Sequence, residues 1–207
     1  MKISFEPKDD LEKAKMQNVQ DLNAGIIDFD EYQRREKRLQ HDLFMPKLME
    51  AYYAGDWESF INIALAVYEV MPDAFLFYDE IPDSLKYDFA IEAYTHHGDS
   101  IPAVRKAVRN AAKYGKPILP EEIRDQEYII VYRAGEENIN KCKYRISWTT
   151  DIDVANFFFS EYINRHANYL YMASIRPADI IAYTDDRNEK EIMQYRKVYD
   201  IQDITPE

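Results

Sequence analysis

A change of sequence pattern near residue 120 constrains the fold of this chain more than any other feature. From Asp9 to about Gly115 the sequence has the signals of successive helices: periodic apolar runs that begin at polar capping residues and end at glycines. Beyond Pro120, short runs rich in β-branched and aromatic residues follow one another, which is typical of strands. The pattern predicts an α+β chain, with an N-terminal helical bundle at 1–120 and a small, mostly antiparallel β domain at 121–207.

Residues that can cap or stop a helix mark the expected boundaries in the first region. Asp28 and Glu31 have the spacing of a capping box, so the helix after the Gly25 stop is expected to form a hairpin with the preceding one. After Pro46 comes a largely apolar helix, which Met71-Pro72 is expected to end. The expected helix starts are Asp9 or Asp10, Asp28, Asp56, Asp83 or Ser84, and Ser100.

The second region is expected to hold six strands and one intervening helix. Asp151 can cap that helix, whose apolar residues include Val154, Ala155 and Phe158. The expected strands are 128–132, 144–149, 169–175, 180–183, 192–195 and 198–201.

Charge and cysteine content exclude several classes of function. A formal net charge of -12 argues against general affinity for nucleic acid, because phosphates would be repelled. A single cysteine, Cys142, cannot form an internal disulfide and suits a reducing compartment, so a cytoplasmic location is expected. The most apolar stretch, residues 60–67, is too short to cross a bilayer, so no membrane role is expected.

Three short polar signals stand in order in the second region. Tyr132-Arg133 closes an apolar strand, where a guanidinium suits either a pyrophosphate or a neighbouring carboxylate. In Ser147-Trp148-Thr149 the two hydroxyls alternate with the indole, so they share one side of a strand. Glu189-Lys190-Glu191 would place two carboxylates on one face if it is a strand. Each signal alone also fits a purely structural role.

Together the three signals resemble the R-S-E class of mono-ADP-ribosyltransferases. That family has an arginine on its first core strand, Ser-x-Ser/Thr on a later one and Glu-x-Glu near the end. The resemblance covers about the last 80 residues and extends through the segments 147–158, 179–183 and 187–192. The helical region has no part in it.

The resemblance implies NAD as substrate and a role for each signal. Arg133, with Tyr132, would clamp the NAD phosphates, Ser147 would hold the nicotinamide ribose and orient the last glutamate, and Thr149 would support the strand beside the cofactor. Glu191 would be the catalytic carboxylate that stabilises the sugar cation as nicotinamide leaves. The other glutamate, Glu189, would orient or deprotonate the acceptor, and its presence implies an arginine side chain of an acceptor protein.

Two departures from the family pattern affect the NAD cleft. The strand region is short, so the helix from Ser100 to Tyr114 is a candidate for one wall, with Arg105 and Arg109 near the phosphates. The aromatic followed three residues later by arginine is missing: after the phenylalanines at 157–159 the next arginine is Arg165. One of those rings is a candidate to stack on nicotinamide.

The same sequence bears on other cofactors and on other functions. With 5 Gly in the chain there is no glycine-rich dinucleotide turn, and the histidines lack metal-ligand spacing, so no metal is expected; these are His41, His96, His97 and His166. The leading hypothesis is a small transferase acting as a toxin or phage effector. The alternatives are an NAD glycohydrolase, an inactive helical and strand-domain binding module, and a structural protein in which the signals are coincidental.

Overall fold

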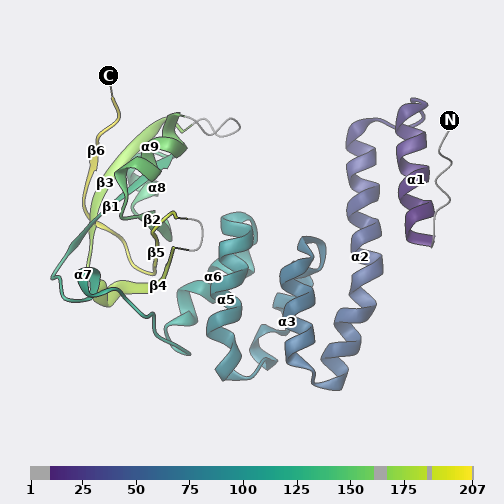
Figure 1. Cartoon of the computed structure of the whole chain (residues 1–207), viewed down its shortest axis with the longest axis horizontal. Coiled ribbons are helices and arrows are strands. Elements are labelled where there is room, and N and C mark those ends of the chain that lie inside the picture. Colours follow the sequence, from purple (N-terminus) through teal and green to yellow (C-terminus); the bar gives the residue numbers. More distant parts are fainter. Residues whose placement is uncertain (1–9, 161–166, 186–187, 207) are drawn as a thin grey trace. The chain divides into compact units, whose positions relative to one another are not determined.

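The computed structural model describes residues 10–160, 167–185 and 188–206 (Figure 1). The chain forms two compact units, Met1–Pro82 with His96–Ala103, and Asp83–Thr95 with Val104–Glu207. An N-terminal helical region is followed by a C-terminal antiparallel sheet of six strands, as expected for an α+β chain. The predicted boundary at 120/121 follows the change from helices to strands. The compact units divide the chain differently, because most of two helices that precede residue 120 belong to the same unit as the sheet.

The first unit is built from helices. Its longer helices are α1 (Asp10–Asn23), α2 (Phe29–Ala54) and α3 (Trp57–Ala66). Shorter helical segments follow: η1 (Tyr68–Val70), α4 (Met71–Ala74), η2 (Phe75–Glu80) and η3 (Gly98–Ser100). The apolar helix therefore ends at Ala66, before the Met71-Pro72 stop that the sequence suggests, because Val67 is extended at φ -129°.

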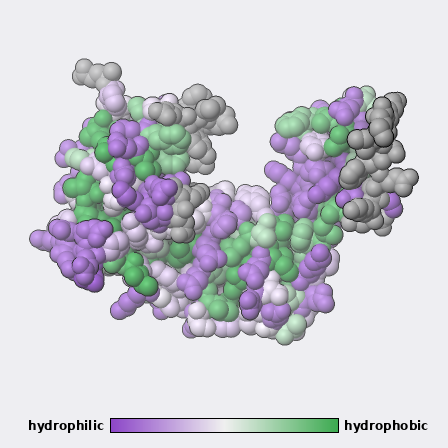
Figure 2. All heavy atoms as spheres, in the orientation of Figure 1, coloured by the Kyte–Doolittle hydropathy of each residue, from purple (hydrophilic) through white to green (hydrophobic). Residues whose placement is uncertain are grey.

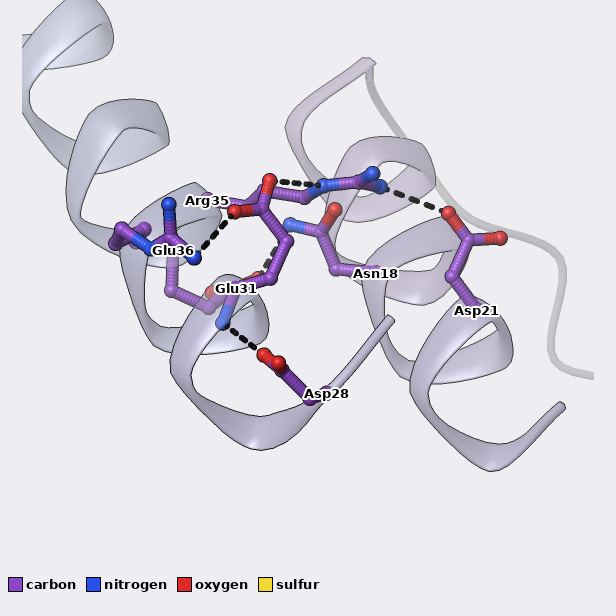
Figure 3. Close-up of polar contacts among 7 residues, drawn as sticks. Asn18, Asp21, Asp28, Glu31, Arg35 and Glu36 are labelled. Atoms are coloured by element: carbon purple, nitrogen blue, oxygen red, sulfur yellow. Dashed lines mark hydrogen bonds and ion pairs between the residues drawn. The ribbon is translucent and has the colours of Figure 1, made fainter. Parts of the chain in front are cut away.

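Polar contacts hold α1 and α2 together as the predicted hairpin. Asp28 caps α2, since its Oδ1 accepts from the Glu31 backbone N–H at 2.7 Å. The Arg35 guanidinium lies between Glu31 and Asp21 (Figure 3), at 3.2 Å from the first carboxylate and 2.8 Å from the second. Because Asp21 belongs to α1, this ion pair joins the two helices.

The second helix of the hairpin continues through Pro46 to Ala54. A proline inside a helix removes one backbone hydrogen bond and normally kinks or ends the helix. Here Leu48 and Ala51, just after the proline, are buried against the rest of the unit. Burial of this last part of α2 offsets the cost of the lost hydrogen bond.

The second unit is a six-stranded sheet with helices around it. All neighbouring strands are antiparallel, in the order β4-β5-β2-β1-β3-β6. The strands are β1 (Ile129–Gly135), β2 (Ser147–Thr149), β3 (Tyr169–Ile175), β4 (Ile180–Thr184), β5 (Glu191–Gln194) and β6 (Tyr199–Asp203). The helices are most of α5 (Asp83–His97) and α6 (Pro102–Ala111), with α7 (Glu121–Arg124), α8 (Ile139–Cys142), α9 (Ile152–Ser160) and η4 (Pro177–Asp179).

One face of this sheet packs into an apolar core. Val131, Trp148 and Ile192, from three adjacent strands, are buried there. Ile123 from α7 and Cys142 from α8 belong to the same core. By strand alternation, the residues between them along each strand face the opposite side.

Helix α5 is attached to the sheet through Tyr87, whose hydroxyl donates to the Ile181 carbonyl at 2.7 Å. Burial raises the pKa of this tyrosine to about 12. Gly115 lies against the same ring: a Cβ at this position would meet Tyr87 Cγ at 2.4 Å. Only a glycine therefore allows the backbone to pass here without moving the ring.

We expect Gly115→Ala to lower the free energy of unfolding by roughly 1–3 kcal/mol, the usual cost of overpacking. Urea denaturation measures this change. Gly135→Ala is the matched control, because its Cβ would meet the end of the Glu137 side chain at 3.0 Å and Arg133 Nε at an ordinary contact distance of 4.0 Å. Equal losses in the two variants would contradict the role of Tyr87.

Hydropathy varies over short distances on the face drawn in Figure 2, where hydrophilic and hydrophobic residues alternate. Among the described residues, no single helix combines the length and the apolar composition needed to cross a membrane. One pair of consecutive segments, Trp57–Ala66 with Tyr68–Glu80, reaches that composition together but is bent by 115°.

Candidate functional site

The three polar signals lie on three adjacent strands, β1, β2 and β5, and in the loop that leads into β5. Thr149 is opposite Tyr132 of β1 on one side and opposite Glu191 of β5 on the other. Residues directly opposite each other in an antiparallel sheet share a face. Tyr132, Thr149 and Glu191 therefore lie in a row, and Ser147, two residues before Thr149, shares their face.

Ser147 and Glu191 are joined directly. The Ser147 hydroxyl donates to Glu191 Oε1 at 2.5 Å. Glu191 is nearly buried, with 9% of its surface exposed. A hydroxyl bonded at this distance fixes the orientation of the carboxylate, which is the relation between serine and last glutamate that the resemblance implies.

Arg133 reaches the same serine, but from the other face of the sheet. Its Nη1 donates to the Ser147 carbonyl oxygen at 2.6 Å, not to the hydroxyl. Alternation along β1 places Arg133 with Val131 on the core face. Burial raises the pKa of the Cys142 thiol on that face to about 11, and the charge of Arg133 opposes the rise. The Arg133 Nε atom is buried and has no hydrogen-bond partner in the described part of the chain.

Thr149 connects the second signal to the third. Its hydroxyl donates to the Glu189 carbonyl oxygen at 2.6 Å and accepts from the Asp151 backbone N–H at 3.0 Å. The threonine thus links the loop before β5 to the start of α9, whose first turn Asp151 caps through the Asp153 N–H at 2.9 Å. Its position supports the segment that carries both glutamates.

Glu189 lies outside the strand, so the two carboxylates do not share a strand face. Strand β5 begins at Glu191, and the two residues flanking Glu189 have left-handed φ values, 55° at Asn188 and 43° at Lys190. Such values are unusual away from glycine and turn the chain sharply. The Glu189 side chain is half-buried in this loop.

Lys190 fixes the same loop from its exposed side. Its Nζ lies 2.9 Å from Asp151 Oδ2, and its carbonyl accepts from the Thr150 N–H at 3.2 Å. The hydrogen bond from Lys190, followed by one from the Asp153 N–H, lowers the pKa of the Asp151 carboxyl. The Asp185 carboxylate accepts from the Lys190 N–H at 3.2 Å. Three contacts therefore hold Lys190, just before Glu191.

The other predicted cofactor contacts are not gathered at this site. Arg109 of α6 is exposed, and its Nη2 donates to the Tyr144 carbonyl at 3.2 Å. Phe157 of α9 is 46% exposed and meets Phe158 edge to face, with centroids 5.7 Å apart. Arg165, His166 and Arg187 lie outside the described residues. Within the described ranges no group of three potential metal ligands is present.

A hollow of about 510 Å³ lies in the second unit, next to the loop that carries Lys190. Arg133, Ser147 and Glu191 are not among the residues that line it. No sequence pattern predicts this hollow, because its walls come from α7, β1, β4 and three loops that are distant in the sequence. The lining residues are Glu122, Ile123, Gln126, Tyr128, Ile129, Ile130, Thr150, Tyr183, Asp185 and Lys190.

No protein-family model, curated protein or solved structure matches this chain. What the site can do chemically therefore follows from its side chains. A hydroxyl orients a nearly buried carboxylate, a guanidinium contacts the backbone of the same serine, and a second carboxylate lies two residues before the first.

Proposed function

We propose that this protein is an NAD-dependent mono-ADP-ribosyltransferase that modifies an arginine side chain of an acceptor protein. The observation that supports the proposal most is the 2.5 Å hydrogen bond from Ser147 to Glu191, two residues 44 positions apart that the resemblance pairs. The contacts of Thr149 and Lys190 support it further, because they hold the loop just before Glu191, the first residue of β5.

In the proposed reaction the bond between C1′ of the ribose and the nicotinamide nitrogen breaks. Its electron pair goes to the pyridinium nitrogen, and positive charge develops on the sugar. The Glu191 carboxylate stabilises that charge and accepts a hydrogen bond from a ribose hydroxyl. A guanidinium nitrogen of the acceptor then bonds to C1′, and its proton passes to Glu189 or to water.

Arg133 would bind the pyrophosphate of NAD with the donors that Ser147 does not use. A guanidinium has five N–H donors, and one of them bonds the Ser147 carbonyl. The Arg133 side chain lies on the core face of the sheet. The proposal therefore requires its guanidinium group to turn toward the face of Glu191 when NAD binds. Tyr132 and Thr149 already share that face.

Glu189→Gln separates transfer from hydrolysis. We expect this variant to release nicotinamide at a rate close to that of the wild type, since Glu191 is intact. Transfer to protein should fall by roughly 10²-fold or more, the usual contribution of a general base. Incubation with NAD and a cell lysate measures both products, free nicotinamide and protein-bound ADP-ribose.

The control is Glu127→Gln, which removes one exposed carboxylate from the loop before β1. It should change neither product. Nicotinamide release without any protein-bound ADP-ribose in the wild type would assign the protein as an NAD glycohydrolase instead.

A catalytically inactive binding module is the second candidate. One observation favours it: Arg133 leaves β1 on the face opposite to Glu191. This alternative predicts that NAD raises the thermal stability of the protein without release of nicotinamide. A ligand at 100 times its dissociation constant adds about 2.7 kcal/mol, which a melting curve detects readily.

A further inference from the structure

The hollow beside β1 has walls suited to a long, flat side chain. Its base is apolar, because Ile123 and Ile129 are buried at 6% and 8% exposure. Tyr128 and Ile130 remain 45% and 47% exposed at its mouth, and Tyr183 forms a further wall. Its volume lies within the range of sites that bind small ligands in proteins.

The charge of the hollow is negative. Glu122 and Asp185 contribute two carboxylates to its lining. Lys190 also lines it, but the ammonium is engaged at 2.9 Å by Asp151, which lies outside the lining. Burial first, and then the charge of Asp185, raise the pKa of the Tyr183 hydroxyl; the charge of Lys190 opposes the rise, and Glu122 adds to it. The potentials of both carboxylates and of Lys190 therefore reach the aromatic wall.

The Asp185 carboxylate is held where a ligand could meet it, and Glu122 is exposed on α7. Asp185 Oδ1 accepts from the Lys190 N–H at 3.2 Å, which fixes its side chain at the rim. Arg124, on the same short helix as Glu122, is bound instead by Asp125 at 2.7 Å. The surroundings of α7 are strongly hydrophilic on the face drawn in Figure 2. The two acids thus face the hollow with no cation from α7 to neutralise them.

We propose that this hollow binds an arginine side chain of a basic partner protein. The planar guanidinium can pack on a tyrosine ring and bond a carboxylate with two N–H groups, which an ammonium cannot do. The hydrocarbon stem would lie along Ile130 and Tyr128 at the mouth. A net charge of -12 favours approach of a basic partner over long distances. The proposal does not depend on cleavage of NAD.

The test uses the full chain and two tripeptides, Gly-Arg-Gly and Gly-citrulline-Gly, which differ in charge but hardly in shape. Titration is followed by changes in backbone amide chemical shifts. We expect the arginine peptide to shift amides at Glu122, Tyr128, Thr150 and Tyr183, and to bind roughly tenfold more tightly than its neutral counterpart.

The variant Glu122→Gln/Asp185→Asn removes both charges but keeps the oxygen that bonds the Lys190 N–H. It should abolish the preference for arginine over citrulline. The control, Glu127→Gln/Glu136→Gln, removes two exposed carboxylates outside the lining and should keep that preference. Shifts spread over the whole acidic surface, or an equal loss in both double variants, would overturn the proposal.

Nicotinamide release is measured in parallel to keep the two proposals apart. The single variant Glu122→Gln should leave that rate unchanged, because Glu122 belongs neither to the Ser147–Glu191 site nor to the contacts that hold Lys190. Peptide binding in a protein that does not cleave NAD would refute only the transferase proposal. If the protein cleaves NAD but binds the arginine and citrulline peptides equally, only the proposal that the hollow binds arginine would be refuted.

Discussion

Glu191→Gln is expected to reduce the rate of nicotinamide release from NAD by roughly 10²–10³, while the protein stays folded. The substitution keeps the side-chain oxygen that accepts from the Ser147 hydroxyl at 2.5 Å, so the local geometry can persist. It removes the negative charge that would stabilise the ribose cation. The loss should appear in kcat, because the charge acts on the transition state more than on bound NAD.

Two comparisons make the Glu191 result specific. Glu127→Gln carries the same chemical change at an exposed position and should keep the wild-type rate. NAD should still raise the melting temperature of Glu191→Gln, since the proposed binding mode relies mainly on contacts to phosphates and ribose. An unchanged rate of nicotinamide release in Glu191→Gln would remove the catalytic role assigned to this residue.

Ser147 should matter less than the glutamate that it orients. Its substitution by alanine removes the hydroxyl donor, but the charge of Glu191 remains on the strand. The two residues act as one unit, so Ser147→Ala in the Glu191→Gln background should cause little further loss.

Local sequence patterns were sufficient to predict most of the secondary structure of the second unit. The run of β-branched and aromatic residues at 169–175 coincides with β3, and Asp151 precedes α9 as expected. These elements are determined by neighbours along the chain. Pro46 shows the limit of such patterns, because burial of Leu48 and Ala51 keeps α2 helical beyond it. That burial depends on residues distant in the sequence.

The candidate site also combines features that the sequence pattern predicts with features that depend on residues distant in the sequence. The approach of Ser147 to Glu191 agrees with the order and spacing of the signals, since both stand on neighbouring strands. The face of Arg133 could not be predicted, because it depends on pairing Tyr132 with Thr149, and a shift by one residue would reverse it. Nor could the left-handed turn at Lys190 be predicted, since no glycine marks it.

The buried carboxylate of Asp179 provides the largest expected effect on stability. It lies between β3 and β4 with 3% of its surface exposed. Arg176 donates to its Oδ2 from Nε at 2.8 Å and from Nη2 at 2.7 Å, and Arg196 Nε lies 3.4 Å from Oδ1. Both arginines reach solvent, whereas the carboxylate does not. Removing the ion pairs would therefore leave the carboxylate, not the arginines, as a charge that is neither paired nor hydrated.

Arg176→Met/Arg196→Met should lower the free energy of unfolding by roughly 3–5 kcal/mol, because it leaves a buried charge without its counterions. Urea denaturation should show a lower midpoint with an unchanged slope. Adding Asp179→Asn to this double variant should restore most of the loss, since a neutral amide is far less costly to bury. Arg124→Met, which breaks an exposed pair with Asp125, is the control and should cost at most about 1 kcal/mol. If Asp179→Asn restores nothing, the arginines stabilise the unit by packing on their neighbours, such as Tyr199 beneath Arg176, and not by neutralising the carboxylate.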